Sequence, residues 1–75
     1  MITRDELADF ITRLSEESTS QEEWFRFALN HFTDGKMETA RRTFVRYCLG
    51  YPPPQDEAHL SLKERLVAIA ATLKE

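Results

Sequence analysis

The residue types that most often carry catalysis or bind metal ions are few in this chain and widely separated. The chain has two histidines, His31 and His59, and one cysteine, Cys48. Neither histidine has a second histidine or a cysteine within four residues, so the spacing of a zinc site is absent. A metal ion could also be bound by Asp56, Glu57 and His59. These residues follow three prolines in an expected exposed linker, which would hold the ligands poorly. We therefore expect no catalytic residue, no metal, no cofactor and no enzyme activity.

Cys48 is a candidate nucleophile only if folding brings a histidine to it. It follows Phe44 and Tyr47 on the apolar face of an expected helix, where cysteine behaves as a small buried hydrophobe. A single cysteine forms no internal disulfide, so we expect a reducing cytoplasm. The sequence has neither an apolar run of about 20 residues nor the start of a signal peptide, so we expect no membrane contact.

The remaining functional signal in the sequence is the uneven distribution of charged residues. The net charge is a mild −3, but residues 1–23 have a balance of −5 and residues 24–50 a balance of +3. Most cations of the central part follow an Asp-Gly turn, and these are Lys36, Arg41, Arg42 and Arg46. A basic helix after a tight turn is typical of helix-turn-helix proteins, whose second helix enters the major groove of DNA.

The detailed pattern of the helix-turn-helix fails in this chain. That motif usually has a small residue four positions before the turn glycine and an apolar residue six positions after it. With Gly35 as the turn glycine, these positions hold His31 and Arg41. The arginines could instead form ion pairs with the acidic side chains of the first helix, or with Glu38 on their own helix. We therefore keep nucleic acid as the alternative partner rather than the first choice.

Regular elements must position these residues, and the most distinctive stretch among them is Trp24–Phe32. Half of the aromatic residues of the chain fall within it. At about 100° per residue, its apolar side chains cover an arc of about 200°, twice the stripe of an ordinary surface helix. Phe25 and Leu29 lie at one edge of this arc. We expect the other helices to pack around this one, and any part left uncovered to be a partner surface.

Local signals place the helix ends. Capping boxes of the type S/T-x-x-E begin at Thr3, Ser20 and Ser61. Apolar residues at helical spacing follow each capping box. The Asp34-Gly35 pair predicts a left-handed residue that ends the second helix, and Gly50 predicts the end of the third. No segment alternates with the period of two that a strand requires.

The segment Tyr51-Pro52-Pro53-Pro54 interrupts the helical pattern. Consecutive prolines adopt the extended polyproline conformation and have no amide donors. An aromatic residue beside prolines could be a ligand for a proline-reading domain, but the P-x-x-P spacing is absent because position 55 is Gln. A stiff spacer that returns the last helix across the bundle is the favoured interpretation, because proline regularly follows helix ends.

The sequence therefore predicts one all-α domain over residues 1–75. We expect a compact bundle of four helices, at about 4–17, 21–32, 36–49 and 62–74, packed around the aromatic second helix. The favoured function is a non-enzymatic protein-binding module or regulator, whose partner is another protein or a second copy of the chain. The candidate partner surface consists of Phe25, Leu29, Lys36, Arg41, Arg42, Arg46 and Tyr51.

Overall fold

The computed structural model describes residues 1–75 and contains helices without any strand. The elements are α1 (Arg4–Ser15), α2 (Gln21–Ala28), α3 (Gly35–Cys48), the short 3₁₀ turn η1 (Gln55–Glu57) and α4 (Leu62–Leu73). The predicted all-α bundle of four helices is confirmed. No helix has both the length and the apolar character needed to cross a membrane.

The capping boxes read from the sequence begin three of the four α-helices. At α1, the Thr3 Oγ1 atom accepts a hydrogen bond from the Glu6 amide at 3.1 Å, and the Glu6 carboxylate accepts one from the Thr3 amide at 3.0 Å. Ser20 and Ser61 form the same reciprocal pairs at α2 and α4. These contacts satisfy amide groups that the first turn of a helix leaves without partners.

Left-handed residues end α1 and α3. The backbone φ angle is 57° at Glu17 and 90° at Gly50. In both places the amide of the residue after the left-handed one donates to a carbonyl of the last helical turn. Ser18 donates to Arg13 at 3.0 Å, and Tyr51 donates to Arg46 at 3.1 Å. Gly50 thus ends α3 as predicted, whereas the first helix ends at Ser15, two residues before the predicted boundary.

The Asp34-Gly35 pair has the opposite role from the predicted one. Asp34 is the N-cap of α3, and its Oδ1 atom accepts hydrogen bonds from the amides of Lys36 at 2.9 Å and Met37 at 3.2 Å. Gly35 is the first residue of α3 and has no positive φ angle. A side-chain oxygen at the N-cap binds two otherwise unpaired amides, so the pair begins a helix and does not end one.

The second helix is shorter than predicted, because it ends at Ala28 and not at residue 32. The side-chain amide of Asn30 donates to the carbonyls of Phe25 at 3.3 Å and Arg26 at 3.2 Å, which closes the last turn. Residues 29–34 therefore form a connection between α2 and α3. His31 lies in this connection, outside the helix that the sequence pattern extended to residue 32.

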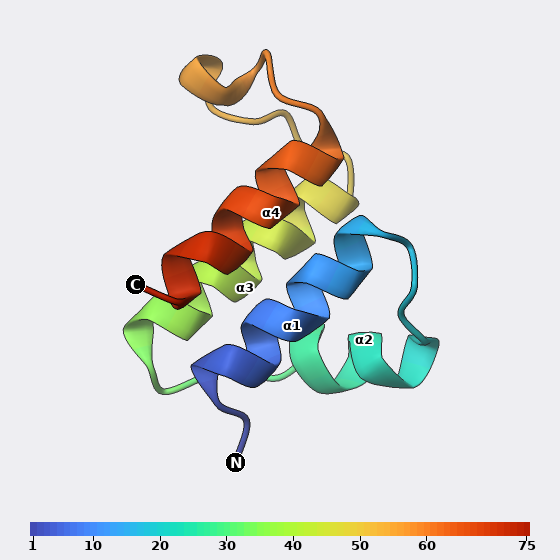
Figure 1. The fold of residues 1–75 in the computed structure, drawn as a ribbon, viewed down its shortest axis with the longest axis vertical. Helices are drawn as coiled ribbons and strands as arrows, with labels where there is room; N and C mark the ends of the chain where they lie inside the picture. The colour runs from blue at the N-terminus through green and yellow to red at the C-terminus, as the bar shows by residue number, and fades with distance from the viewer.

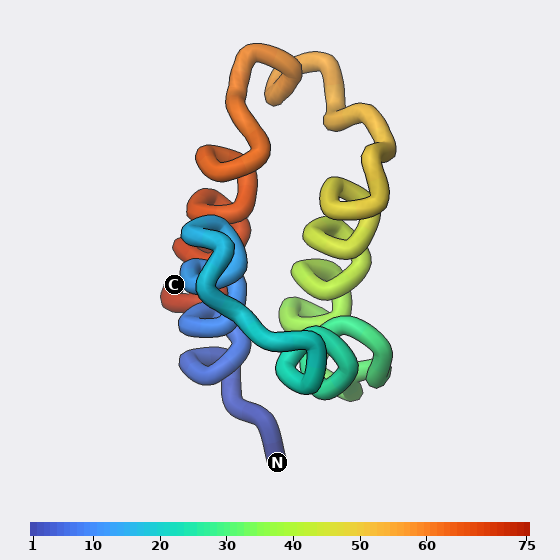
Figure 2. The backbone as a smooth tube through the Cα atoms, turned by 90° about the vertical axis from the view of Figure 1, so that its right-hand side faces the viewer, coloured from blue at the N-terminus to red at the C-terminus, as the bar shows by residue number.

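The structure differs from expectation in which helix lies at the centre. The side chains of Leu7, Ala8, Phe10 and Ile11 on α1 are all 0 % exposed. In Figures 1 and 2, α1 and α4 lie side by side in opposite directions, α3 covers their inner face, and α2 crosses near the end where α1 and α3 begin. The centre is α1, because it lies between the other helices, whereas α2 has one buried face.

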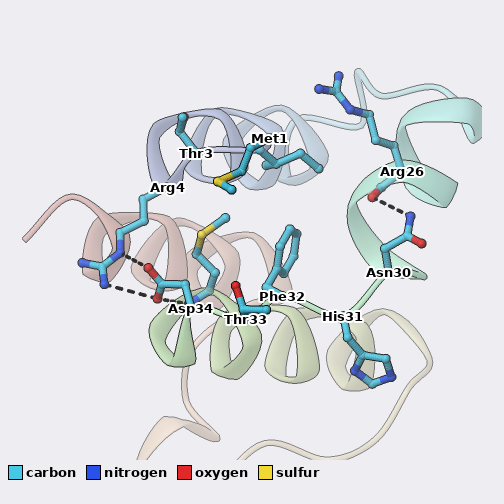
Figure 3. A pocket seen from close by; sticks show the side chains of 11 residues that line it. Met1, Thr3, Arg4, Arg26, Asn30, His31, Phe32, Thr33 and Asp34 are labelled. Atoms are coloured by element: carbon cyan, nitrogen blue, oxygen red, sulfur yellow. Dashed lines mark hydrogen bonds and ion pairs between the residues drawn. The ribbon is translucent and has the colours of Figure 1, made fainter.

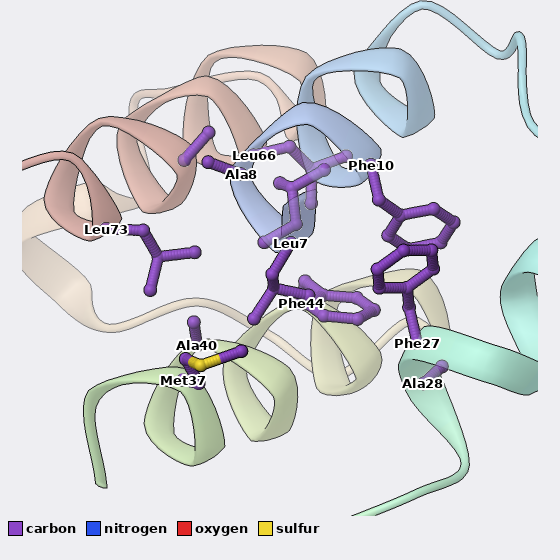
Figure 4. Packing of buried hydrophobic residues seen from close by; sticks show 12 residues of the cluster. Leu7, Ala8, Phe10, Phe27, Ala28, Met37, Ala40, Phe44, Leu66 and Leu73 are labelled. Atoms are coloured by element: carbon purple, nitrogen blue, oxygen red, sulfur yellow. The ribbon is translucent and has the colours of Figure 1, made fainter. Parts of the chain in front are cut away.

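The aromatic helix contributes to the core from its side. The Phe27 ring stacks on the Phe10 ring with 4.5 Å between centroids, and Phe44 of α3 lies 5.8 Å from Phe10 (Figure 4). Trp24 and Phe32 are partly buried against the same cluster. Phe25, by contrast, is exposed. The wide apolar arc is therefore covered on one side only.

Cys48 is exposed, contrary to the prediction of a buried residue. It is the last residue of α3, and the two residues that follow it are exposed as well. Tyr47, which is 8 % exposed, is therefore the last residue of α3 that belongs to the core. Partial covering of the thiol by neighbouring atoms raises the pKa of Cys48, which disfavours the thiolate form.

Candidate interaction surface

The edge of the apolar arc that the other helices leave uncovered holds Phe25 and Leu29. Phe25 is 49 % exposed and Leu29 is 59 % exposed. Leu29 is the C-cap of α2 and keeps a right-handed helical backbone, so it lies about one turn after Phe25 and the two side chains are neighbours on the surface. Phe27 lies about 200° from Phe25 around the helix and is 3 % exposed. We call Phe25 and Leu29 together the α2 edge.

Several contacts hold the α2 edge in place. Glu23 at the start of α2 forms an ion pair with Arg13 of α1, with 2.6 Å between Nη1 and Oε2. At the other end, the Arg41 guanidinium of α3 donates from Nη1 to the carbonyl of Ala28 at 3.0 Å. The short helix is thus tied to α1 at its beginning and to α3 at its end.

Arg41 belongs to the interior side of the α2–α3 connection. Its side chain is 12 % exposed. It donates to both carboxylate oxygens of Glu38, from Nε at 2.9 Å and from Nη2 at 2.7 Å. This two-point contact and the contact with Ala28 engage three guanidinium nitrogens, so the structure places Arg41 as a link between two helices.

Glu38, the partner of Arg41, also contacts residues of the connection between α2 and α3. Its carboxylate accepts from the Phe32 amide at 3.0 Å and lies 2.8 Å from the Nδ1 atom of His31. Its hydrogen bonds with Arg41, and next those with Phe32 and His31, hold the pKa of the Glu38 carboxyl well below its usual range. A carboxylate with this many donors stays ionised and fixes the path of residues 29–34.

The other predicted basic residues lie in separate places. Arg42 is well exposed at 71 %, and its Nε atom lies 3.4 Å from the Glu38 carboxylate. The Arg46 guanidinium lies over the ring of Tyr51, 4.9 Å from its centroid. Lys36 is half-buried beside a hollow between α3 and α4. The seven candidate residues therefore do not form one surface. Phe25 lies beside Leu29, Arg46 lies over Tyr51, and Arg41 and Arg42 both contact Glu38, whereas Lys36 stands apart.

A hollow that the sequence did not predict lies beside the N-terminus (Figure 3). It has a volume of about 500 Å³, and its apolar lining comes from Met1, Ile2, Phe32 and Met37. An ion pair between Arg4 and Asp34, 2.8 Å long, stands at its rim. The hollow exists because residues 30–34 leave the helix, whereas the sequence pattern extended the helix to Phe32.

Comparisons with protein-family models, with curated proteins and with solved structures each give no match. No three or more histidine, cysteine, aspartate or glutamate side chains lie together in a way that could hold a metal ion. The α2 edge is apolar and exposed, and it belongs to a short helix that is tied to both α1 and α3.

Proposed function

We propose that the chain is a non-enzymatic protein-binding module of the cytoplasm, and that the α2 edge contacts its partner or a second copy of the chain. The observation that carries the proposal is the paired exposure of Phe25 on α2 and Leu29 at its C-cap, because α2 is tied to its neighbours at both ends. Burying the exposed part of each side chain would contribute about 1–2 kcal/mol. A strip that is already rigid loses little conformational entropy on binding.

The free cysteine supports the proposed location. Cys48 is exposed and has no partner for a disulfide within the chain. An exposed thiol in an oxidising compartment would pair between molecules, whereas a reducing cytoplasm leaves it free. This argument concerns the compartment only and assigns no chemistry to the thiol.

The contacts of the basic residues weigh against nucleic acid as the partner. Arg41 is committed to Glu38 and Ala28, and Arg42 lies near the same carboxylate. A phosphate that recruited these side chains would have to separate them from their present partners. Few cations would then remain to neutralise a phosphate backbone, which is the main source of affinity in such complexes.

The proposal can be tested by placing a charge on the α2 edge. The double variant Phe25→Glu, Leu29→Glu and the control Val67→Glu each introduce carboxylates at exposed apolar positions, since Val67 of α4 is 46 % exposed. We expect the double variant to keep its helical circular dichroism but to lose its protein complex, or its own dimer, in sedimentation velocity. The control should retain the complex.

Two results would contradict the proposal. One is a complex that survives the double variant unchanged. The other is a complex that disappears on nuclease treatment and on reversal of Arg42 and Arg46 to glutamate, which would favour the nucleic-acid alternative.

A further inference from the structure

The sequence of the connection between α3 and α4 favours a short polyproline helix. Each proline fixes its own φ angle near −65° and restricts the residue before it to extended conformations. These rules apply to every residue from Tyr51 to Pro54. Pro54 has φ −55° and ψ 153°, which are polyproline II values. In Figure 2 this segment lies in the arch at the end of the molecule away from α2.

The exposure of the segment follows the period of that helix. Polyproline II has about three residues per turn, so Tyr51 and Pro54 share one edge, Pro52 lies on a second, and Pro53 lies on the third. Tyr51, Pro52 and Pro54 are exposed, and Pro53 is half-buried. One edge therefore faces the protein and two edges face outward.

Both ends of the segment are tied to α3. Upstream, the Tyr51 amide donates to the Arg46 carbonyl at 3.1 Å, and the Arg46 guanidinium covers the tyrosine ring. Downstream, the Glu57 amide donates to the Pro54 carbonyl at 2.9 Å, and the buried Tyr47 hydroxyl donates to the Glu57 carboxylate at 3.0 Å. Both ends of the segment are thus held on α3 in the free protein.

The middle of the segment keeps its hydrogen-bonding capacity. No hydrogen bond is made to the carbonyl of Pro52 or Pro53. An indole N–H or a tyrosine hydroxyl of a partner could donate to these oxygens while its ring packs on the prolines. Domains that read polyproline helices present such donors in aromatic-lined grooves.

We propose that Tyr51–Pro54 is a preformed ligand for the aromatic-lined groove of a proline-reading domain. Tyr51 takes the place of the first proline of a P-x-x-P spacing, because Tyr51 and Pro54 lie on one outward edge. The conformational entropy of ordering a loop is already lost in the free protein, which favours binding. This surface is separate from the α2 edge and goes beyond the proposed function.

The test uses the whole protein as the ligand. SH3, WW and EVH1 domains labelled with ¹⁵N are each titrated with the unlabelled chain up to millimolar concentration. We expect at least one domain to show chemical-shift changes at the aromatic residues of its groove. The changes should be lost with the double variant Pro52→Ala, Pro54→Ala and with Tyr51→Ala, and should persist with Phe25→Glu, Leu29→Glu.

A second variant separates the conformation of the segment from its side chains. Tyr47→Phe removes the hydrogen bond to Glu57 and leaves all three prolines in place, so it should weaken binding by up to about tenfold. Melting curves of each variant check that the fold is intact, which we expect because the substituted prolines are exposed. Shift changes in none of the three domains, or changes that the proline variants leave unaltered, would overturn the proposal.

Discussion

At the scale of single residues, the two glycines have opposite roles although both stand next to the ends of α3. Gly50 has a φ angle of 90° and ends α3. Gly35 is the first residue of α3 and has no positive φ angle. A β-carbon at either glycine would meet no atom within 4 Å. The backbone conformation alone therefore decides how each position responds to substitution.

The first prediction follows from this contrast. Gly35→Ala should raise the free energy of unfolding by about 0.5–1 kcal/mol, because alanine restricts the unfolded chain and fits the native backbone. Gly50→Ala should lower it by about 1–2 kcal/mol, because a side chain disfavours the left-handed conformation. Urea denaturation of the two variants measures both changes. Changes of the same sign would mean that the assigned backbone conformations are wrong.

The second prediction concerns Glu38 and pH. Its pKa is lowered in the folded protein, mainly by the hydrogen bonds from Arg41, and is near 4.3 when the chain is unfolded. Below about pH 5 the unfolded state therefore binds a proton that the folded state resists, so stability falls as the pH falls. The melting temperature should drop between about pH 5 and pH 3. Glu38→Gln should be less stable at neutral pH and should show a shallower drop.

That comparison isolates Glu38 from the other carboxylates. The pKa values of Glu6, Glu23, Asp34 and Glu64 are lowered as well, by hydrogen bonds at helix ends and by ion pairs. These groups stay in place in the Glu38→Gln variant, so the remaining pH dependence is theirs. Equal slopes for the parent protein and the variant would mean that Glu38 does not hold the α2–α3 connection.

At the scale of the elements, the helix starts that carry a capping box could be predicted, whereas the N-cap of α3 at Asp34 was assigned the opposite role. A capping box is formed by residues three apart, so Thr3, Ser20 and Ser61 could be identified from the sequence. The end of α2 could not, because apolar residues continue to Phe32 after the helix has stopped at Ala28. The helix end depends on Asn30, which closes the last turn, and on the N-cap at Asp34.

The candidate site could likewise be predicted only in part. The exposure of Phe25 and Leu29 follows from their position at the edge of a predicted apolar arc, so the α2 edge could be found from the sequence. The role of Arg41 could not be found, because its partner is the Ala28 carbonyl, thirteen residues away, at a helix end that the sequence misplaced. The hollow beside the N-terminus depends on the same connection.

The third prediction compares the central helix with the α2 edge. Phe10 is 0 % exposed and contacts the rings of Phe27 and Phe44, so Phe10→Ala should cost about 3–5 kcal/mol. A domain of this size has a total stability of only a few kcal/mol, which is comparable to this cost, so the variant should be largely unfolded. Phe25→Ala should change stability by less than about 0.5 kcal/mol. Far-UV circular dichroism of the two variants gives the comparison, and a folded Phe10→Ala protein would contradict the placement of the core.

At the scale of the whole molecule, the number of helices could be predicted but their arrangement could not. Four capped or stopped apolar patterns indicate four helices, whatever their neighbours are. Which helix lies at the centre depends on packing between residues far apart in the sequence: the most extensive contact is between α1 and α4, the first and last helices. The concentration of aromatic residues in α2 therefore reflects a contribution to the core, and the prediction that the other helices pack around α2 was wrong.

The two proposed interaction surfaces lie at opposite ends of the molecule. The α2 edge lies near the end where α1 begins, and the polyproline arch lies at the other (Figure 1). The two surfaces share no residue, so a variant in one should leave binding at the other unchanged. The α2 edge carries the proposed function, and a direct measurement of its contacts tests that function.

Site-specific photo-cross-linking provides that measurement. A photoreactive amino acid is placed at position 29, on the α2 edge, or at position 67, an exposed apolar position on α4, in the cells that make the protein. We expect a specific cross-link to a protein, either a partner or a second copy of the chain, from position 29 and none from position 67. Cross-linking from position 67 alone, or from neither position, would contradict the claim that the α2 edge binds a protein.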